Sequence, residues 1–255
     1  MTAEIEIDAF WEAVAVSGLL PERDLSSARS TLDTSVENPS RSASAIAGEL
    51  VRRKRLTPYQ AKILLAGHSG PFRYGSYLLL KQIDAQTFAA RHSKTGFGVW
   101  LHFFPGTHPA DLKRWDAVET RADELSRFRH ASALPVFESL VTPQYRFIVT
   151  GRPRGKTLRD QLPPGKRIPP RTAARVTASI ARGVAALHRR GMVAGPIDPA
   201  RVWIQSGTAT QFLPNLLDDS DELTPADDSQ SVAALFYRIV TGAECSDNDS
   251  IETSA

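Results

Sequence analysis

The first part of the chain repeats its apolar positions with a helical period. Apolar side chains recur every three or four residues in three stretches, which run over residues 10–19, 25–32 and 46–51. A further helix is predicted from Pro58 to Leu65, because Thr57 and Gln60 form a capping box and Pro58 suits a first helical turn. We therefore predict an all-helical region over residues 1–70, which is either a recruitment module or a small bundle that packs on its neighbour.

The pattern changes after Gly70-Pro71. Runs rich in β-branched and aromatic residues predict strands at residues 77–83, 99–104, 134–140 and 145–150. Between the second and third runs, apolar residues from Leu112 to Phe128 step by three or four and predict a helix. The later chain is mostly helical, with helices predicted over residues 170–190 and after Thr224 and a short strand around residues 202–204. This order predicts an α+β fold in two lobes.

Composition and charge exclude several classes of protein. A hydrophobic content of 42% and a net charge of +3 are ordinary for a globular protein, and the basic run Arg52–Arg55 is typical of a helix C-terminus. We therefore predict no nucleic-acid partner. Cys245 stands alone, no histidine spacing suits a metal, and no apolar stretch reaches the about 20 residues that a membrane helix needs. We expect a cytoplasmic protein without a metal and without membrane contact.

Five phrases, in chain order, resemble bacterial serine/threonine protein kinases. They are Ala90–His92 with Thr95-Gly96, Arg127–His130 with Leu134–Val136, Gly155–Leu158, Gly183–Gly191, and Asp228–Val232 with Thr241-Gly242. The segment Leu56–Ala61 also resembles the helical leader of some of these kinases. The resemblance implies a two-lobed protein kinase-like fold with a truncated C-lobe over residues 75–243. The helical region 1–70 precedes it, and we expect residues 244–255 to form a polar disordered tail.

The resemblance also says where the catalytic groups of a kinase would stand. Phosphoryl transfer needs a glycine-rich phosphate cradle, a Lys held by a Glu, a base, and Mg²⁺ ligands. The cradle falls on residues 84–89, which contain no glycine. His102 stands in place of the Lys, Arg121 in place of its Glu, Pro196 in place of the base, and Arg201 in place of the Asn that binds Mg²⁺.

The segment that would supply the second metal ligand has two possible registers. Spacing from Arg201 favours Leu213-Pro214-Asn215, which contains no acid, whereas a longer connection would bring in Asp218 and Asp219. By the first register Leu213 is a further degenerate motif position, beside His102, Arg121, Pro196 and Arg201. We predict no catalytic, cofactor-binding or metal-binding residue.

Other residues near these motifs have structural interpretations. We expect Asp198 to be a turn or capping carboxylate beside Pro199. The resemblance implies that Asp228 accepts hydrogen bonds from the backbone of the catalytic loop. We expect His102 to lie outside the core, and Trp100 to be a core aromatic residue or to fill the adenine pocket.

The sequence leaves three interpretations open: two functions, and a protein without a function. The first is a pseudokinase, that is, a catalytically inactive kinase-like domain that acts as a binding or regulatory scaffold for a protein partner and needs no cofactor. The alternative is a divergent serine/threonine protein kinase that uses ATP and Mg²⁺ through relocated groups. The third is a decayed gene product without a selected role.

Overall fold

The computed structural model describes residues 5–33, 42–104, 109–142, 144–163, 165–205, 209–216 and 223–243, with backbone alone for 109–113. The chain divides into two compact units, residues 1–102 and 103–255. The expected tail, residues 244–255, and the acidic residues Asp218 and Asp219 lie outside the described residues.

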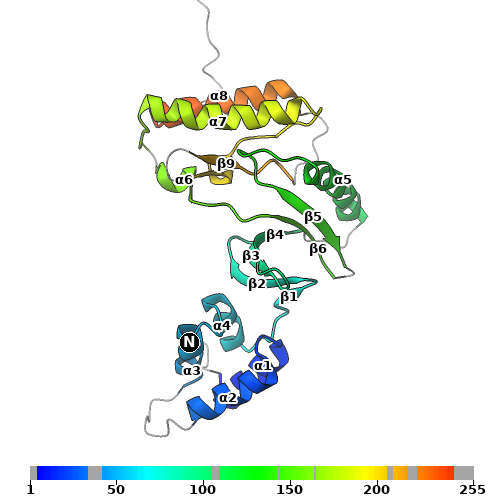
Figure 1. The fold of residues 1–255 in the computed structure, drawn as a ribbon, viewed down its shortest axis with the longest axis vertical. Coiled ribbons are helices and arrows are strands. Elements are labelled where there is room, and N and C mark those ends of the chain that lie inside the picture. The colour runs from blue at the N-terminus through cyan, green and yellow to red at the C-terminus, as the bar shows by residue number, and fades with distance from the viewer. Residues whose placement is uncertain are drawn as a thin grey trace, which may run out of the picture. The chain divides into compact units, whose positions relative to one another are not determined.

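Four helices open the first unit (Figure 1). They are α1 (Ile7–Ser17), α2 (Glu22–Asp33), α3 (Ala43–Arg52) and α4 (Pro58–Leu65). Their apolar faces enclose one cluster that includes Phe10, Trp11, Leu50 and Leu64, each at most 2% exposed. The predicted helices are confirmed, and their apolar residues pack into this shared core.

The start of α4 is capped as the sequence predicts. The Thr57 hydroxyl accepts a hydrogen bond from the Gln60 amide, and the Gln60 side chain accepts one from the Thr57 amide. The Gln60 side-chain amide also donates to the Leu79 carbonyl, 2.7 Å away. Phe72 belongs to the same apolar cluster and Leu78 packs against it, so the helices share their core with the strand region that follows.

The strands of the first unit are antiparallel neighbours in chain order. They are β1 (Arg73–Tyr74), β2 (Tyr77–Gln82), β3 (Thr87–His92) and β4 (Gly98–Phe104). The strand β3 was not predicted, because its residues 87–89 were assigned to the cradle loop. Instead the Asp84 carboxylate accepts hydrogen bonds from the Gln86 and Thr87 amides at 2.9 and 2.7 Å and closes a short turn.

The second unit begins with a helix and a hairpin. The helix α5 (Pro109–Ser126) precedes the antiparallel strands β5 (Val136–Val141) and β6 (Arg146–Gly151). A second small antiparallel sheet has the order β7 (Lys156–Thr157), β8 (Val202–Ile204) and β9 (Thr210–Phe212). The short helix α6 (Leu158–Gln161) and the 3₁₀ turn η1 (Pro199–Arg201) flank this sheet.

Two long helices, α7 (Pro170–His188) and α8 (Pro225–Thr241), run side by side (Figure 1). The predicted stripe of α7 is confirmed, since Ala173, Val176, Ile180, Val184 and Leu187 are all buried. The helix α8 begins with a capping box between Thr224 and Asp227. Sequence reasoning predicted both helices because each has a clear start signal and a continuous apolar face.

Leu187→Ala should lower the free energy of unfolding by about 2–5 kcal/mol, because Leu187 is fully buried and the change leaves a cavity. Urea denaturation followed by circular dichroism measures the loss. The control is Arg182→Ala on the exposed face of the same helix, which should stay within about 0.5 kcal/mol. Equal losses in the two variants would contradict the assigned faces of α7.

Candidate functional site

A loop in the second unit, residues 193–197, follows α7 and is anchored to the start of α8. Asp228 is 0% exposed, and its two carboxylate oxygens accept hydrogen bonds from the Ala194 and Gly195 amides at 2.7 and 2.8 Å. Its Oδ2 also lies 2.7 Å from Nε2 of His188, at the end of α7. The expected hydrogen bonds from the loop backbone to Asp228 are thus confirmed.

The loop offers no side-chain base at the expected position. Pro196 is exposed, and its carbonyl oxygen accepts a 3.2 Å hydrogen bond from the Asp198 amide. The Asp198 carboxylate caps η1 through the Ala200 amide at 2.7 Å and pairs with the Arg159 guanidinium at 2.8 Å. The capping role expected of Asp198 is confirmed, and both interactions engage its oxygens.

Arg201 is held by the segment that follows β9. Its guanidinium donates to the Asn215 side-chain oxygen at 3.0 Å and to the Pro214 carbonyl at 3.3 Å. The Leu213 amide donates to the Arg201 carbonyl at 3.0 Å, so side chain and backbone both join the two segments. Residues 213–216 carry no carboxylate, and the alternative register at Asp218 and Asp219 lies outside the described residues.

A glycine lets these segments approach closely. The Asn215 amide donates to the Ala194 carbonyl at 2.8 Å. A Cβ at Gly195 would lie 2.7 Å from the Cβ of Asn215, and Gly195 has a φ of +75°. Both facts favour glycine here, because a side chain would clash and the backbone is left-handed.

Arg121 connects α5 to the same loop. Its guanidinium donates to the Val193 carbonyl and lies 3.9 Å from the Glu124 carboxylate. Its side chain is 21% exposed, and this burial lowers the pKa of Arg121, against the opposing influence of Glu124 and Asp228. Glu119, the other nearby acid, instead accepts a hydrogen bond from Ser139 on β5. Of the five degenerate motif positions, the structure therefore gathers Arg121, Pro196, Arg201 and Leu213 around one loop.

His102 belongs to the first unit and is buried, at 7% exposed. Its Nδ1 lies 3.4 Å from the Thr87 hydroxyl on β3, in direct register across the strands. The expectation that His102 lies outside the core is wrong, because β4 is covered at successive positions rather than on one face alone. Trp100 is only half-buried, so the expectation of a core aromatic residue is also wrong.

Neither a metal centre nor a membrane helix was found in the described part of the chain. Among the residues that the structure describes, no group of three or more His, Cys, Asp or Glu side chains could hold a metal ion. Over the same ranges no helix has the length and apolar character needed to cross a bilayer.

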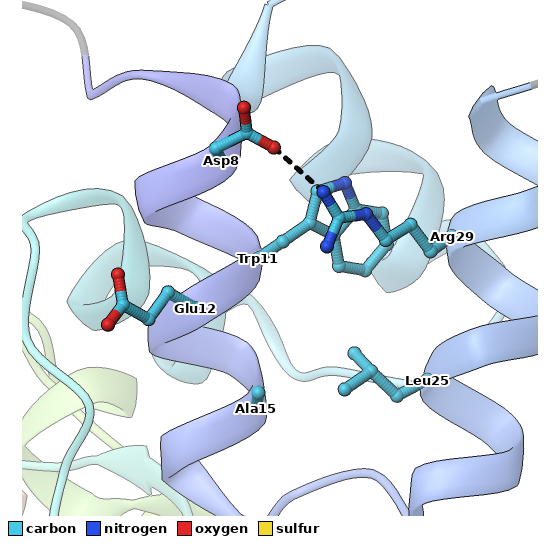
Figure 2. A pocket seen from close by; sticks show the side chains of 6 residues that line it. All are labelled: Asp8, Trp11, Glu12, Ala15, Leu25 and Arg29. Atoms are coloured by element: carbon cyan, nitrogen blue, oxygen red, sulfur yellow. Dashed lines mark hydrogen bonds and ion pairs between the residues drawn. The ribbon is translucent and has the colours of Figure 1, made fainter.

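A pocket in the helical region is a second candidate site (Figure 2). Its volume is about 340 Å³, near the lower end for small-molecule sites. It is lined by Asp8, Trp11, Glu12, Ala15, Leu25 and Arg29. Asp8 and Arg29 pair at 2.7 Å, while the indole N–H of Trp11 is buried and has no hydrogen-bond partner within the described residues. Sequence analysis did not predict this pocket, because it arises where α1 meets α2.

Comparisons with known proteins identify the fold. The chain is similar to the PknI kinase domain of Mycobacterium tuberculosis, with a TM-score of 0.56 and 16% identity, over 67% of this chain and 76% of that one. A cysteine-to-alanine mutant of that domain gives a TM-score of 0.57 and 16% identity, over 69% and 78%. No protein-family model and no curated protein matches the sequence. The chain therefore has a protein kinase-like fold, as the five phrases predicted.

Asp228→Ala should destabilise the protein by about 3 kcal/mol or more, because it leaves two buried amides without an acceptor. Asp228→Asn keeps one acceptor oxygen and should fall between this variant and the wild type. Both are measured by urea denaturation. A loss below about 1 kcal/mol for Asp228→Ala would show that the loop does not depend on this carboxylate.

His102→Ala should cost about 2 kcal/mol, since it empties a buried position next to Thr87. Asp198→Asn should stay within about 1 kcal/mol, because asparagine also caps a helical turn. Thermal unfolding of both variants provides the comparison. The assignment of His102 to the core fails if the two losses are the same.

Proposed function

We propose that this chain is a pseudokinase, a kinase-like domain that binds a protein partner as a scaffold or regulator and transfers no phosphate. The observation that carries the proposal is Arg201. It stands where the resemblance places the Asn that binds Mg²⁺, and its guanidinium is bonded to Asn215 and Pro214.

Electrostatics supports this interpretation of Arg201. Two like unit charges 4 Å apart near a protein surface repel each other by about 4 kcal/mol, and a divalent ion roughly doubles this repulsion. Arg121, a second cation, is bonded to the loop 193–197 at Val193. Two guanidinium groups near this loop, and an Asp198 carboxylate already bonded to Arg159 and Ala200, make it a poor place for Mg²⁺, whose preferred ligands are carboxylate and phosphate oxygens.

The missing base supports the proposal independently. Pro196 has no side-chain acceptor, and the nearest acid along the chain, Asp198, is bonded to Arg159 and Ala200. General-base catalysis requires an acceptor within hydrogen-bond reach of the substrate proton. Catalysis of phosphoryl transfer is almost entirely positioning and electrostatic stabilisation, so the joint loss of cradle, Lys, Glu, base and Asn removes both.

In contrast to the catalytic groups, the residues that stabilise the fold are present. Asp228 anchors the loop, and the inward-facing apolar residues of α7 and α8 are buried. A fold that keeps its anchors without its reacting groups is suited to binding. We propose a protein partner in the cytoplasm rather than a nucleic acid or a membrane, and no cofactor.

Mg-ATP should leave the thermal unfolding curve of the purified chain unchanged. A ligand present at about 100 times its Kd would add about 2.7 kcal/mol of stability and raise the melting temperature visibly. Transfer of radiolabelled phosphate from ATP to a generic protein substrate should also be absent, with an active serine/threonine kinase as the positive control.

The alternative, a divergent kinase, predicts the opposite in both assays. Asp218→Asn/Asp219→Asn then becomes the decisive variant, because these residues are the candidate metal ligands of the second register. A Mg²⁺-dependent rise in melting temperature, together with phosphotransfer that this double variant abolishes, would replace the pseudokinase by an active enzyme.

A further inference from the structure

The solvent face of α7 carries a stripe of arginines. The arginine stripe consists of Arg171, Arg175, Arg182 and Arg189, all exposed, with Arg189 at the C-cap. Their spacings of four, seven and seven residues place them within about 40° of one another around the helix, along about 27 Å of its length. This is the side opposite the buried stripe from Ala173 to Leu187.

The charges of this stripe have no acidic partner among the residues that the structure describes. Residues 161–197 contain seven Lys and Arg residues and no Asp or Glu. No ion pair or side-chain hydrogen bond joins the four arginines to any of the residues that the structure describes. An ordinary solvated helix face mixes both signs at i,i+4, whereas Arg171 and Arg175 repel each other at that spacing.

Small residues run alongside the arginine stripe. Ala174, Ala178 and Ala185 lie next to it, and their spacing is four and seven residues. A second helix meets side chains every seven residues along a partner, and alanines let it approach closely while charges beside the contact select its sequence. The geometry of α7 therefore fits a helix whose acidic residues repeat with the same period.

We propose that the exposed face of α7 docks an acidic helix of a protein partner, with carboxylates at seven-residue spacing against the arginine stripe. Arginine suits this role because its planar guanidinium binds a carboxylate through two parallel hydrogen bonds. The inference rests on the binding role proposed above and gives it a class of partner.

Other anionic surfaces fit the face less well. A helix that lies on a membrane needs bulky apolar residues beside its cations, and here alanines take those positions. Proteins that bind nucleic acids supplement arginine with polar side chains that contact phosphates and base edges. On the exposed positions of α7 from Arg171 to Arg182 the residues are arginine and alanine alone.

Fluorescence anisotropy with the full chain tests the proposal. The probe is a labelled 21-residue helical peptide with Glu at one position of each heptad, and a peptide of the same composition with shuffled Glu positions is its control. The stripe variant is Arg175→Gln/Arg182→Gln/Arg189→Gln. Its charge-matched control is Lys62→Gln/Arg91→Gln/Lys94→Gln, three exposed cations of the first unit.

The heptad peptide should bind the wild-type chain and the control variant, and bind the stripe variant about tenfold more weakly, as expected for three exposed ion pairs. Binding should weaken with added salt. Arg175→Glu/Arg182→Glu/Arg189→Glu should recover binding to a peptide that carries Lys at the heptad positions. Circular dichroism confirms that all variants are folded.

Three results would overturn the proposal: no binding of the heptad peptide at low salt, equal binding of the shuffled peptide, or equal losses in the stripe and control variants. Tighter binding of a duplex DNA or of phosphatidylserine vesicles, lost in the stripe variant, would assign the face to that partner instead. The Mg-ATP assays do not involve α7, so they can fail while the docking result stands, and the reverse.

Discussion

The buried carboxylate of Asp228 is the interaction on which the second unit's central loop depends. A buried carboxylate needs hydrogen-bond partners in place of water. Here the partners come from two segments: the Ala194 and Gly195 amides of the loop, and the His188 ring at the end of α7. The carboxylate thereby joins the end of α7, the loop and the start of α8. The contacts of Asn215 with Ala194 and of Arg121 with Val193 require the loop to be in this position.

This anchor shows how a kinase-like fold can hold the loop without help from the loop's own side chains. Two of the donors to Asp228 are backbone amides, which no substitution short of proline removes. The side chain at the exposed loop position 196 is therefore free to vary, whereas Gly195 is held to glycine by its close approach to Asn215. Pro196 lies in the loop with its side chain exposed, and Arg201, just beyond it, is paired with Asn215. Holding the loop and equipping it with reactive groups are separate physical requirements.

The sequence predicted the parts of the fold that have local signals. Thr57 and Thr224 begin helices with capping boxes, and the stripe from Ala173 to Leu187 has a single buried face, so these helices follow from short-range chemistry. The strand β3 was missed because the turn before it contains neither Gly nor Pro and is closed by Asp84 instead. The role of Asp228 could be predicted from the family resemblance, because the order of the matching phrases along the chain identifies its position.

Other features depend on tertiary structure or on a helical projection of the sequence. The burial of His102 does not follow from alternation, because Leu101 beside it is buried as well. The pocket of Trp11 and Arg29 exists only where two helices meet. The arginine stripe does have a sequence signal, its spacings of four, seven and seven residues, but these residues share a face only when the chain is drawn as a helix.

The contact between Arg201 and Asn215 also has a consequence for how the protein responds to its surroundings. A metal ion that bridges two segments can dissociate, be chelated, or exchange as its concentration changes. A guanidinium attached to the chain can do none of these, and it remains charged across the physiological pH range. The contact between the segments of Arg201 and Asn215 therefore does not depend on the supply of divalent ions.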